Sequence, residues 1–361
     1  MTARAADEMC PHSGGQTCQR CSWARPRDAV LLVVRGRTAR KALPVAAVVG
    51  TVLSLVNQGS VIAGGATTSG TWVRVAVNYL VPFLVASIGY LSGRRVRAPA
   101  VDWPRYLAGY HRDRPGITER LLTGAMAGRG AAPYPWLVEP LRDEPGPILD
   151  LACGSAPTRL LLRRERWIGI DASASELAVA AAAGRRPLVR GDAGALPVAD
   201  GVIGSVCAAM CLQVLTPMDV VLAEVRRVLR PGGMVVALVP SRVGPRSSGV
   251  LGWVRVMRAL GIRSEPWPNP QARDGLARLL RAHGFVVDSD QRRMYHCEIA
   301  DPSDAALLID ALYLPGVDTE SLNRAKDVLA SWATPGRGLP LPLRRVVAHL
   351  PLIEPGGELF Q

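Results

Sequence analysis

The sequence predicts an α/β fold, a doubly wound and mostly parallel sheet, preceded by two helices long and apolar enough to cross a membrane. Three aspartates, Asp150, Asp171 and Asp192, are spaced 21 residues apart, and each closes an apolar run. That interval is about the length of one strand and one helix, so it places the acids at equivalent ends of successive parallel strands. Upstream, residues 42–73 and 75–93 contain no charged side chain. The chain therefore divides into an apolar front and an α/β body.

The apolar front, residues 36–97, is expected to form a transmembrane hairpin. We place its spans near residues 42–62 and 72–92, because each uncharged stretch can hold a helix of about 20 residues, the length that crosses a bilayer. Buried core helices are the alternative, but a soluble helix pair would show a polar face that neither stretch has. Basic residues flank the pair at 35–41 and 94–97. Both ends are therefore predicted to be cytoplasmic, with the hairpin in a bacterial inner membrane.

The polar and flexible N-terminus, residues 1–35, carries Cys10, His12, Cys18 and Cys21. Thiolates and an imidazole are zinc ligands, so this cluster could form a tetrahedral metal site; a tail with incidental cysteines is the other interpretation. We therefore assign no metal ligand. Residues 1–29 are polar and charged, so no signal peptide is expected.

The segment 147–158 predicts a buried strand, a tight turn of small residues and a helix that opens at Pro157. Gly154 allows a ligand to approach the backbone closely. A dinucleotide fingerprint would need two further glycines, where this chain has Ala156 and Arg159. Asp150, beside the turn, would repel a pyrophosphate and attract a cationic amino group.

The next two strand ends complete the predicted ligand. Asp171 ends the second strand, where a carboxylate can accept hydrogen bonds from both hydroxyls of a ribose. Asp192 ends the third, where it could accept from an exocyclic amine such as that of adenine. An amino group, a ribose and an adenine together describe S-adenosylmethionine.

Residues 105–350 resemble a class I S-adenosylmethionine-dependent methyltransferase. The resemblance rests on four motifs in order, at residues 150–158, 169–173, 191–201 and 227–233. It implies a Rossmann-like sheet of seven strands in a domain at 147–361, preceded by a linker and cofactor-capping helices at 98–146. Helices inserted between the last two strands, at 301–338, would form the acceptor lid, and residues 241–272 are expected to be a mobile connection. The chain departs from the family pattern at Ala156, Gly204 and the pair Gln213-Val214.

The resemblance also implies which residues hold the cofactor. They are Asp150, Ala152, Gly154, Ser155, Ala156, Asp171, Ala172, Asp192, Ala193 and Ala209. The alternative is that these are packing, turn and capping residues of any doubly wound sheet. No catalytic residue is assigned: His111 and His296 are candidate bases, but a surface or packing role is the commoner one for a lone histidine.

Residues 36–96 resemble the small two-helix nitrate/nitrite transporter family of the NrtS type. The matching residues are 40–43, 48–51, 57–59 and 79–82, while Ser60 stands where that family is expected to have an acid. Two helices cannot enclose a pore alone, so transport would require a homo-oligomer formed through the hairpin.

The net charge of +13 is carried almost wholly by arginine. Such a surface suits an anionic membrane leaflet, and nucleic acid is the rival partner. The residues after the fourth strand, 206–210, lack the Pro-Pro-aromatic motif of adenine amino methylases, so nucleic acid is not favoured. We expect a membrane-tethered methyltransferase that acts on a small-molecule or lipid-like acceptor. A nitrate/nitrite transport protein with a fused S-adenosylmethionine-binding regulatory domain is the alternative, and an RNA methyltransferase is a weaker one.

Overall fold

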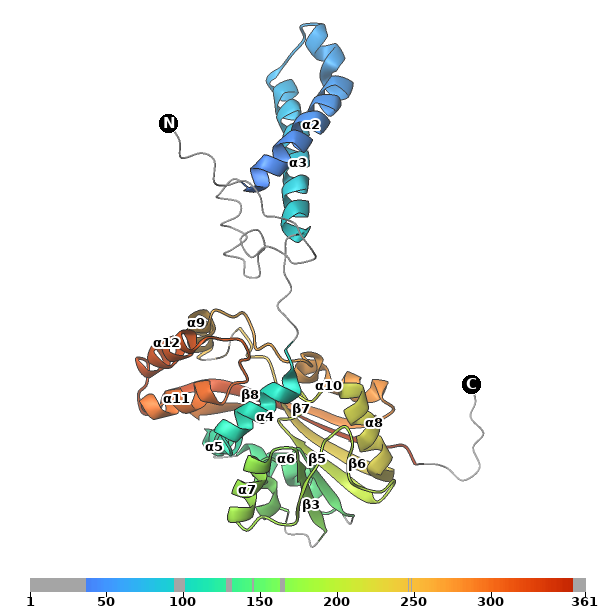
Figure 1. Cartoon of the computed structure of the whole chain (residues 1–361), viewed down its shortest axis with the longest axis vertical. Coiled ribbons are helices and arrows are strands. Elements are labelled where there is room, and N and C mark those ends of the chain that lie inside the picture. Colours follow the sequence, from blue (N-terminus) through green and yellow to red (C-terminus); the bar gives the residue numbers. More distant parts are fainter. Residues whose placement is uncertain are drawn as a thin grey trace, which may run out of the picture. The chain divides into compact units, whose positions relative to one another are not determined.

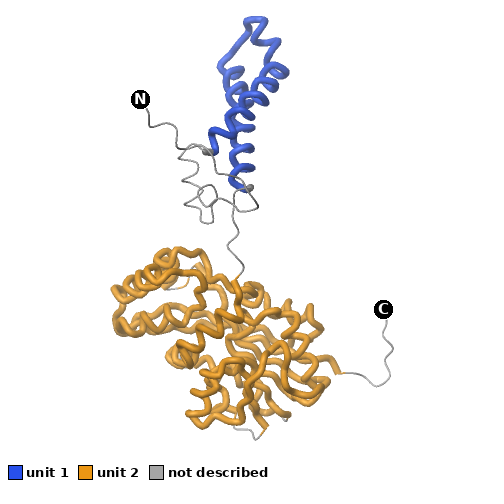
Figure 2. The backbone as a smooth tube through the Cα atoms, in the orientation of Figure 1, with its two compact units in different colours: residues 1–100 blue, residues 101–361 orange. Residues whose placement is uncertain are grey.

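The computed structural model describes residues 37–93, 101–127, 132–144, 146–162, 166–245, 247 and 249–352. These residues belong to two compact units, residues 1–100 and residues 101–361 (Figure 2). The predicted zinc cluster, Cys10, His12, Cys18 and Cys21, lies outside the described residues.

The first unit is a helical hairpin of α2 (Arg37–Ala63) and α3 (Ser69–Gly93), which contain the two predicted spans (Figure 1). Polar side chains join the helices: the hydroxyls of Thr51 and Tyr79 lie 2.9 Å apart, and Asn78 donates to Ser54 at 3.3 Å. Gly50 makes room for the Tyr79 ring, because a Cβ there would lie 2.4 Å from the ring carbon Cδ1. These four polar side chains therefore face each other, whereas Asn57 and Ser60 are exposed.

Much of the outward surface of the hairpin is apolar. More than a third of the side-chain surface is exposed at many large aliphatic residues of both helices, among them Leu55, Val56, Val85 and Ile88. Both helices are long and apolar enough to span a membrane by length and composition. Insertion in a bilayer stays a prediction.

The second unit is built on a mixed sheet of eight strands in the order β1-β7-β8-β6-β5-β2-β3-β4. The strands are β1 (Ala125–Met126), β2 (Ile148–Leu151), β3 (Trp167–Asp171), β4 (Leu188–Arg190), β5 (Ile203–Ala209), β6 (Leu229–Pro240), β7 (Val286–Glu298) and β8 (Gly338–His349). Strands β2 to β6 pair in parallel, and β1, β7 and β8 pair antiparallel. The prediction of seven strands is therefore wrong by one: β1 adds a two-residue edge strand, too short to give a strand pattern in sequence.

Helices cover both faces of this sheet, as the doubly wound prediction requires. They are α4 (Trp103–Asp113), α5 (Ile117–Thr123), α6 (Pro133–Val138), α7 (Ala174–Ala182), α8 (Met218–Val228), α9 (Val250–Leu260), α10 (Gln271–Ala282), α11 (Pro302–Asp310) and α12 (Thr319–Ala330). Consecutive residues of β5 belong to the hydrophobic cores on opposite faces of the sheet. Cys207 belongs to the core that contains α6 and α9, whereas Val206 and Ala208 belong to the core that contains α8 and α10. Figure 1 shows α8 and α10 on one side of the sheet and α9, α11 and α12 on the other.

Two local predictions need correction. The helix expected to open at Pro157 is a single 3-10 turn, η3 (Pro157–Leu160). The expected mobile connection at 241–272 contains α9, which packs against α12 and β8. This helix is fixed because Gly252 brings it close to Leu339 and because the Trp253 Nε1–H donates to the Pro340 carbonyl at 2.7 Å.

The departure from the family pattern at Gly204 has a packing reason. A Cβ on Gly204 would lie 2.6 Å from the Cα of Gly146, which precedes β2. Both atoms belong to backbone, so neither can move aside as a flexible side chain would. Only glycine fits at this point of contact between β5 and the chain entering β2.

We predict that Gly204→Ala lowers the free energy of unfolding by about 2 kcal/mol, the usual cost of overpacking a core. Urea unfolding of the full chain in detergent micelles measures it. Gly124→Ala is the control, because its Cβ would lie 3.7 Å from the nearest atoms and its φ is −78°. Equal losses in the two variants would contradict the packing explanation.

Candidate active site

A cavity of about 370 Å³ opens at the carboxyl ends of the parallel strands. Its walls come from the turns after β2, β3, β4 and β5, from α4, and from Tyr313 after α11. Carboxyl ends of parallel strands are where open α/β sheets bind ligands. Every predicted cofactor residue except Ala156 lines this cavity; these are Asp150, Ala152, Gly154, Ser155, Asp171, Ala172, Asp192, Ala193 and Ala209. Ala156 is fully buried behind the turn.

Asp150 is a buried carboxyl with one oxygen free of partners among the described residues. Its Oδ2 accepts a hydrogen bond from the Thr158 hydroxyl, while Oδ1 is buried without a partner. Burial raises the pKa of Asp150 to about 7, and the nearby Asp171 adds to the shift. A cationic amino group bound here would satisfy Oδ1 and restore the charged form.

Asp171 holds two backbone turns together. Its Oδ2 accepts from the Gly154 amide at 2.8 Å and its Oδ1 from the Ser173 amide at 2.7 Å. Burial raises the pKa of Asp171, and these two hydrogen bonds offset part of the shift. A carboxylate has about four acceptor positions, so both oxygens can still accept from a ribose. Asp192 is exposed at the cavity edge, where its Oδ1 accepts from the Gly194 amide at 2.7 Å.

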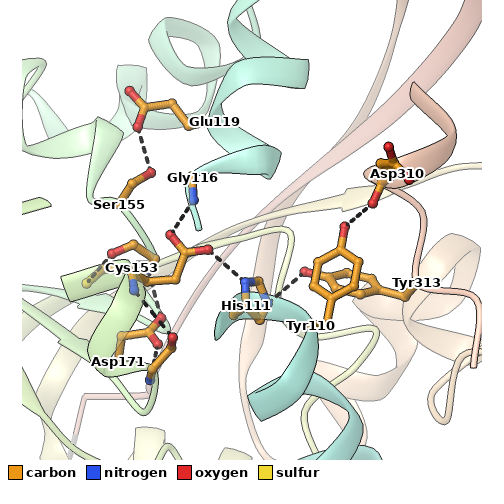
Figure 3. A network of polar contacts seen from close by, with 12 residues as sticks. Tyr110, His111, Gly116, Glu119, Cys153, Ser155, Asp171, Asp310 and Tyr313 are labelled. Carbon is orange, nitrogen blue, oxygen red and sulfur yellow. Dashed lines mark hydrogen bonds and ion pairs between the residues drawn. The ribbon is translucent and has the colours of Figure 1, made fainter. Parts of the chain in front are cut away.

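Glu176 lines the cavity and was not among the predicted site residues. It is 3% exposed, and its carboxylate accepts from His111 Nδ1 at 2.7 Å and from the Gly116 amide at 2.9 Å. Figure 3 labels both partners, His111 and Gly116. His111 Nε2 lies 3.2 Å from the Tyr313 hydroxyl. The three side chains Glu176, His111 and Tyr313 form one polar chain along the cavity wall.

The sequence signal at Glu176 points elsewhere. Ser173 and Glu176 have the Ser-x-x-Glu spacing of a capping box, in which the glutamate binds the amide of the capping serine. Ser173 does cap α7 by accepting from the Glu176 amide. Its own amide, however, is taken by Asp171, and the Glu176 carboxylate turns to His111 instead.

A second network supports the turn after β2. Glu119 accepts from the Ser155 hydroxyl at 2.6 Å and from both terminal nitrogens of Arg185. Burial would raise the pKa of Glu119, but the hydrogen bonds from Arg185 and Ser155 outweigh it and hold the pKa below its ordinary value. Of the two candidate bases, His111 lines the cavity, whereas His296 is an exposed residue of β7 that pairs with Met126.

The cavity is lined by carboxyl groups, by the basic residues His111, Arg112 and Arg190, and by apolar side chains. Five carboxyl groups line it, from Asp150, Asp171, Asp192, Glu119 and Glu176. The apolar wall consists of Pro104, Leu107, Ala108, Met210, Val214 and Leu215. The unpartnered Oδ1 of Asp150, with the other acids nearby, fits a ligand that carries an amino group and a positive sulfur. This set of hydrogen-bond acceptors therefore fits S-adenosylmethionine.

Residues 149–237 match the family described as a methyltransferase domain. This segment is therefore similar to methyltransferase domains, and the cofactor that the similarity implies is S-adenosylmethionine. The transporter-like resemblance of residues 36–96 lies outside the matched segment and stays a prediction.

Curated relatives include two demethylmenaquinone methyltransferases. That of Mycolicibacterium paratuberculosis is 41% identical over 91 residues, which are 25% of this chain and 39% of the relative. That of Mycolicibacterium vanbaalenii is 36% identical over 138 residues, which are 37% of this chain and 60% of the relative. The chain thus spans less than two thirds of the length of these relatives.

A solved methyltransferase from Thermotoga maritima is 14% identical and has a TM-score of 0.39, covering 68% of this chain and 96% of that one. A likeness at that level bears on neither activity nor substrate.

We predict that Asp171→Ala lowers the affinity for S-adenosylmethionine roughly 100-fold, because it removes the predicted ribose acceptor and frees the Gly154 turn; each charged hydrogen bond is worth about 1.5–3 kcal/mol. Calorimetric titration of the full chain measures the affinity, and circular dichroism verifies the fold. Unchanged affinity in a folded variant would show that the ribose lies elsewhere.

We also predict a pH dependence from Asp150. Because its pKa is raised to about 7, the carboxyl is neutral below that pH and charged above it. If the charged form binds the amino group, affinity should rise on the order of tenfold from pH 5.5 to 7.0. Asp150→Asn should flatten this profile, apart from any contribution of Asp171, and Asp192→Asn should keep it. A wild-type profile without slope would refute the role of Asp150.

Proposed function

We propose that the chain is a membrane-tethered methyltransferase that transfers the methyl group of S-adenosylmethionine to a small-molecule or lipid-like acceptor. The observation that carries this proposal is the cavity, which joins an acidic end suited to the cationic cofactor to an apolar wall formed by α4 and the loop after β5. The fold alone would not fix the activity, since one fold hosts many functions.

S-adenosylmethionine supplies an electrophilic methyl group on a positively charged sulfur. The task of the chain is then to hold the acceptor in line and to exclude water. Asp150 would hold the amino group and Asp171 the ribose, while Asp192 and Ala193 would contact the adenine. Gly154 and Ser155 in the turn after β2 would flank the methionine portion, whereas the buried Ala156 would not.

His111 is suited to take a proton from the acceptor. With Nδ1–H donated to the Glu176 carboxylate, Nε2 is left as an acceptor that faces Tyr313. The buried carboxylate would stabilise the imidazolium that forms. This arrangement suits an acceptor that loses a proton on methylation, such as a hydroxyl group.

Two features favour an acceptor with lipid character. Pro104, Leu107 and Ala108 of α4 give the cavity an apolar wall, and the same chain carries a hairpin with many exposed aliphatic side chains. Several curated relatives carry the name demethylmenaquinone methyltransferase, and another is a malonyl-[acyl-carrier protein] O-methyltransferase from Alcanivorax borkumensis. An apolar acceptor drawn from the bilayer is consistent with both features.

We predict that membranes containing the full chain, given S-adenosylmethionine labelled in the methyl group, transfer label to a total lipid extract. The labelled product should partition into organic solvent, and Asp171→Ala should abolish it. Label found only in added RNA would overturn the acceptor class. The chain could instead bind the cofactor while no label enters the lipid, soluble-metabolite or RNA fraction. That result would overturn the proposed methyltransferase activity and favour a regulatory domain.

A further inference from the structure

Helix α9 presents an exposed face that combines apolar side chains with arginines. Leu251 is 70% exposed and Val254 is 47% exposed, and Arg255 and Arg258 are exposed beside them. These positions are three or four residues apart, so they share one side of the helix. Basic and apolar residues on one helix face are typical of helices that lie at a membrane surface.

The opposite side of α9 is fixed to the second unit. Val256 and Leu260 are buried, and a Cβ on Gly252 would lie 2.4 Å from Leu339 of β8. The Trp253 hydrogen bond to Pro340 adds a second attachment to the same strand. The outer face therefore has a defined position and is free for a partner.

The charge around this face is strongly positive. Residues 241–264 contain five arginines and no acidic residue. Among the residues that the structure describes, Arg255, Arg258 and Arg263 form no ion pair, although other arginines such as Arg227 do. On the neighbouring helix α12, Glu320 is 3.3 Å from Arg324 of the same helix, so its charge is already balanced.

We propose that this face docks on a bilayer that contains anionic lipids. Leu251 and Val254 would enter the interface, and Arg255 and Arg258 would bind headgroup phosphates. Nucleic acid would also attract the arginines, but its backbone gives nothing to two exposed aliphatic side chains. A bilayer with anionic lipids can bind both the aliphatic side chains and the arginines of this face.

The position of α9 in the second unit is consistent with a lipid bilayer as the partner. Figure 1 shows α9 on the same side of the second unit as the start of α4, where the chain enters that unit. Only residues 94–100 separate α3 from this entry, and that length of chain reaches at most about 30 Å. The docking face rests on the proposed membrane tether, which would keep the bilayer within this reach.

Hydrogen–deuterium exchange of the full chain in lipid nanodiscs tests the proposal. Discs of phosphatidylcholine alone are compared with discs that also contain phosphatidylglycerol. Peptides covering 250–260 should exchange roughly tenfold more slowly in the anionic discs. Either pair of substitutions, Leu251→Ser with Val254→Ser or Arg255→Gln with Arg258→Gln, should remove this protection. Val220→Ser, at a 44% exposed site on α8, should keep it.

The hairpin peptides, residues 37–93, separate the two proposals. Protected hairpin peptides with equal exchange of 250–260 in both discs would overturn the docking face and leave the tether intact. Unprotected hairpin peptides would overturn the tether and the docking face with it. Protection of 250–260 by added RNA, without protection by phosphatidylglycerol, would also overturn the lipid assignment.

Discussion

The cavity depends on one carboxylate, that of Asp171. It accepts from the backbone of two separate turns, at Gly154 after β2 and at Ser173 after β3. The first turn has Ala152, Gly154 and Ala156 at φ of 50°, 55° and 56°. The left-handed conformation costs a non-glycine residue about 1–2 kcal/mol, so this turn needs support from outside itself. Asp171 supplies this support by binding the Gly154 amide, and Gly154 lines the cavity.

Much of the parallel half of the sheet could be predicted, because its signals are local. Each signal is an apolar run followed by an acid and a turn of small residues, all within ten residues of sequence. The signal recurs at an interval that equals the length of one strand and one helix. Asp150, Asp171 and Asp192 therefore meet at one edge of the sheet, as expected. The edge strand β1 could not be predicted, because two residues carry no periodicity and depend on pairing with Cys297 and His296 of β7. Helix α9 was hidden for a similar reason, since its docking depends on Leu339 and Pro340.

The polar network of the site could not be predicted from the sequence, and the reason differs from that for β1 and α9. Glu176 meets His111 and Gly116, which precede it by 65 and 60 residues, and no local pattern encodes that pairing. The local pattern that does exist, the capping box with Ser173, predicts a structural role for the glutamate. The carboxylate changes role because Asp171 has already bound the serine amide. The departure at Gly204 is likewise explained only by its contact with Gly146.

Helix α4 connects the proposed tether to the proposed chemistry. It begins two residues into the second unit and supplies Pro104, Leu107 and Ala108 to the apolar wall and His111 to the polar chain.

The helix is held down at three points: His111 binds Glu176, the Tyr110 hydroxyl donates to the Asp310 carbonyl at 2.8 Å, and the Tyr106 hydroxyl accepts from the Leu314 amide at 2.9 Å. Two of these partners, Asp310 and Leu314, belong to the segment at and after α11, within the predicted lid. Side chains of α4 therefore join the apolar wall of the cavity to the segment predicted to form the lid.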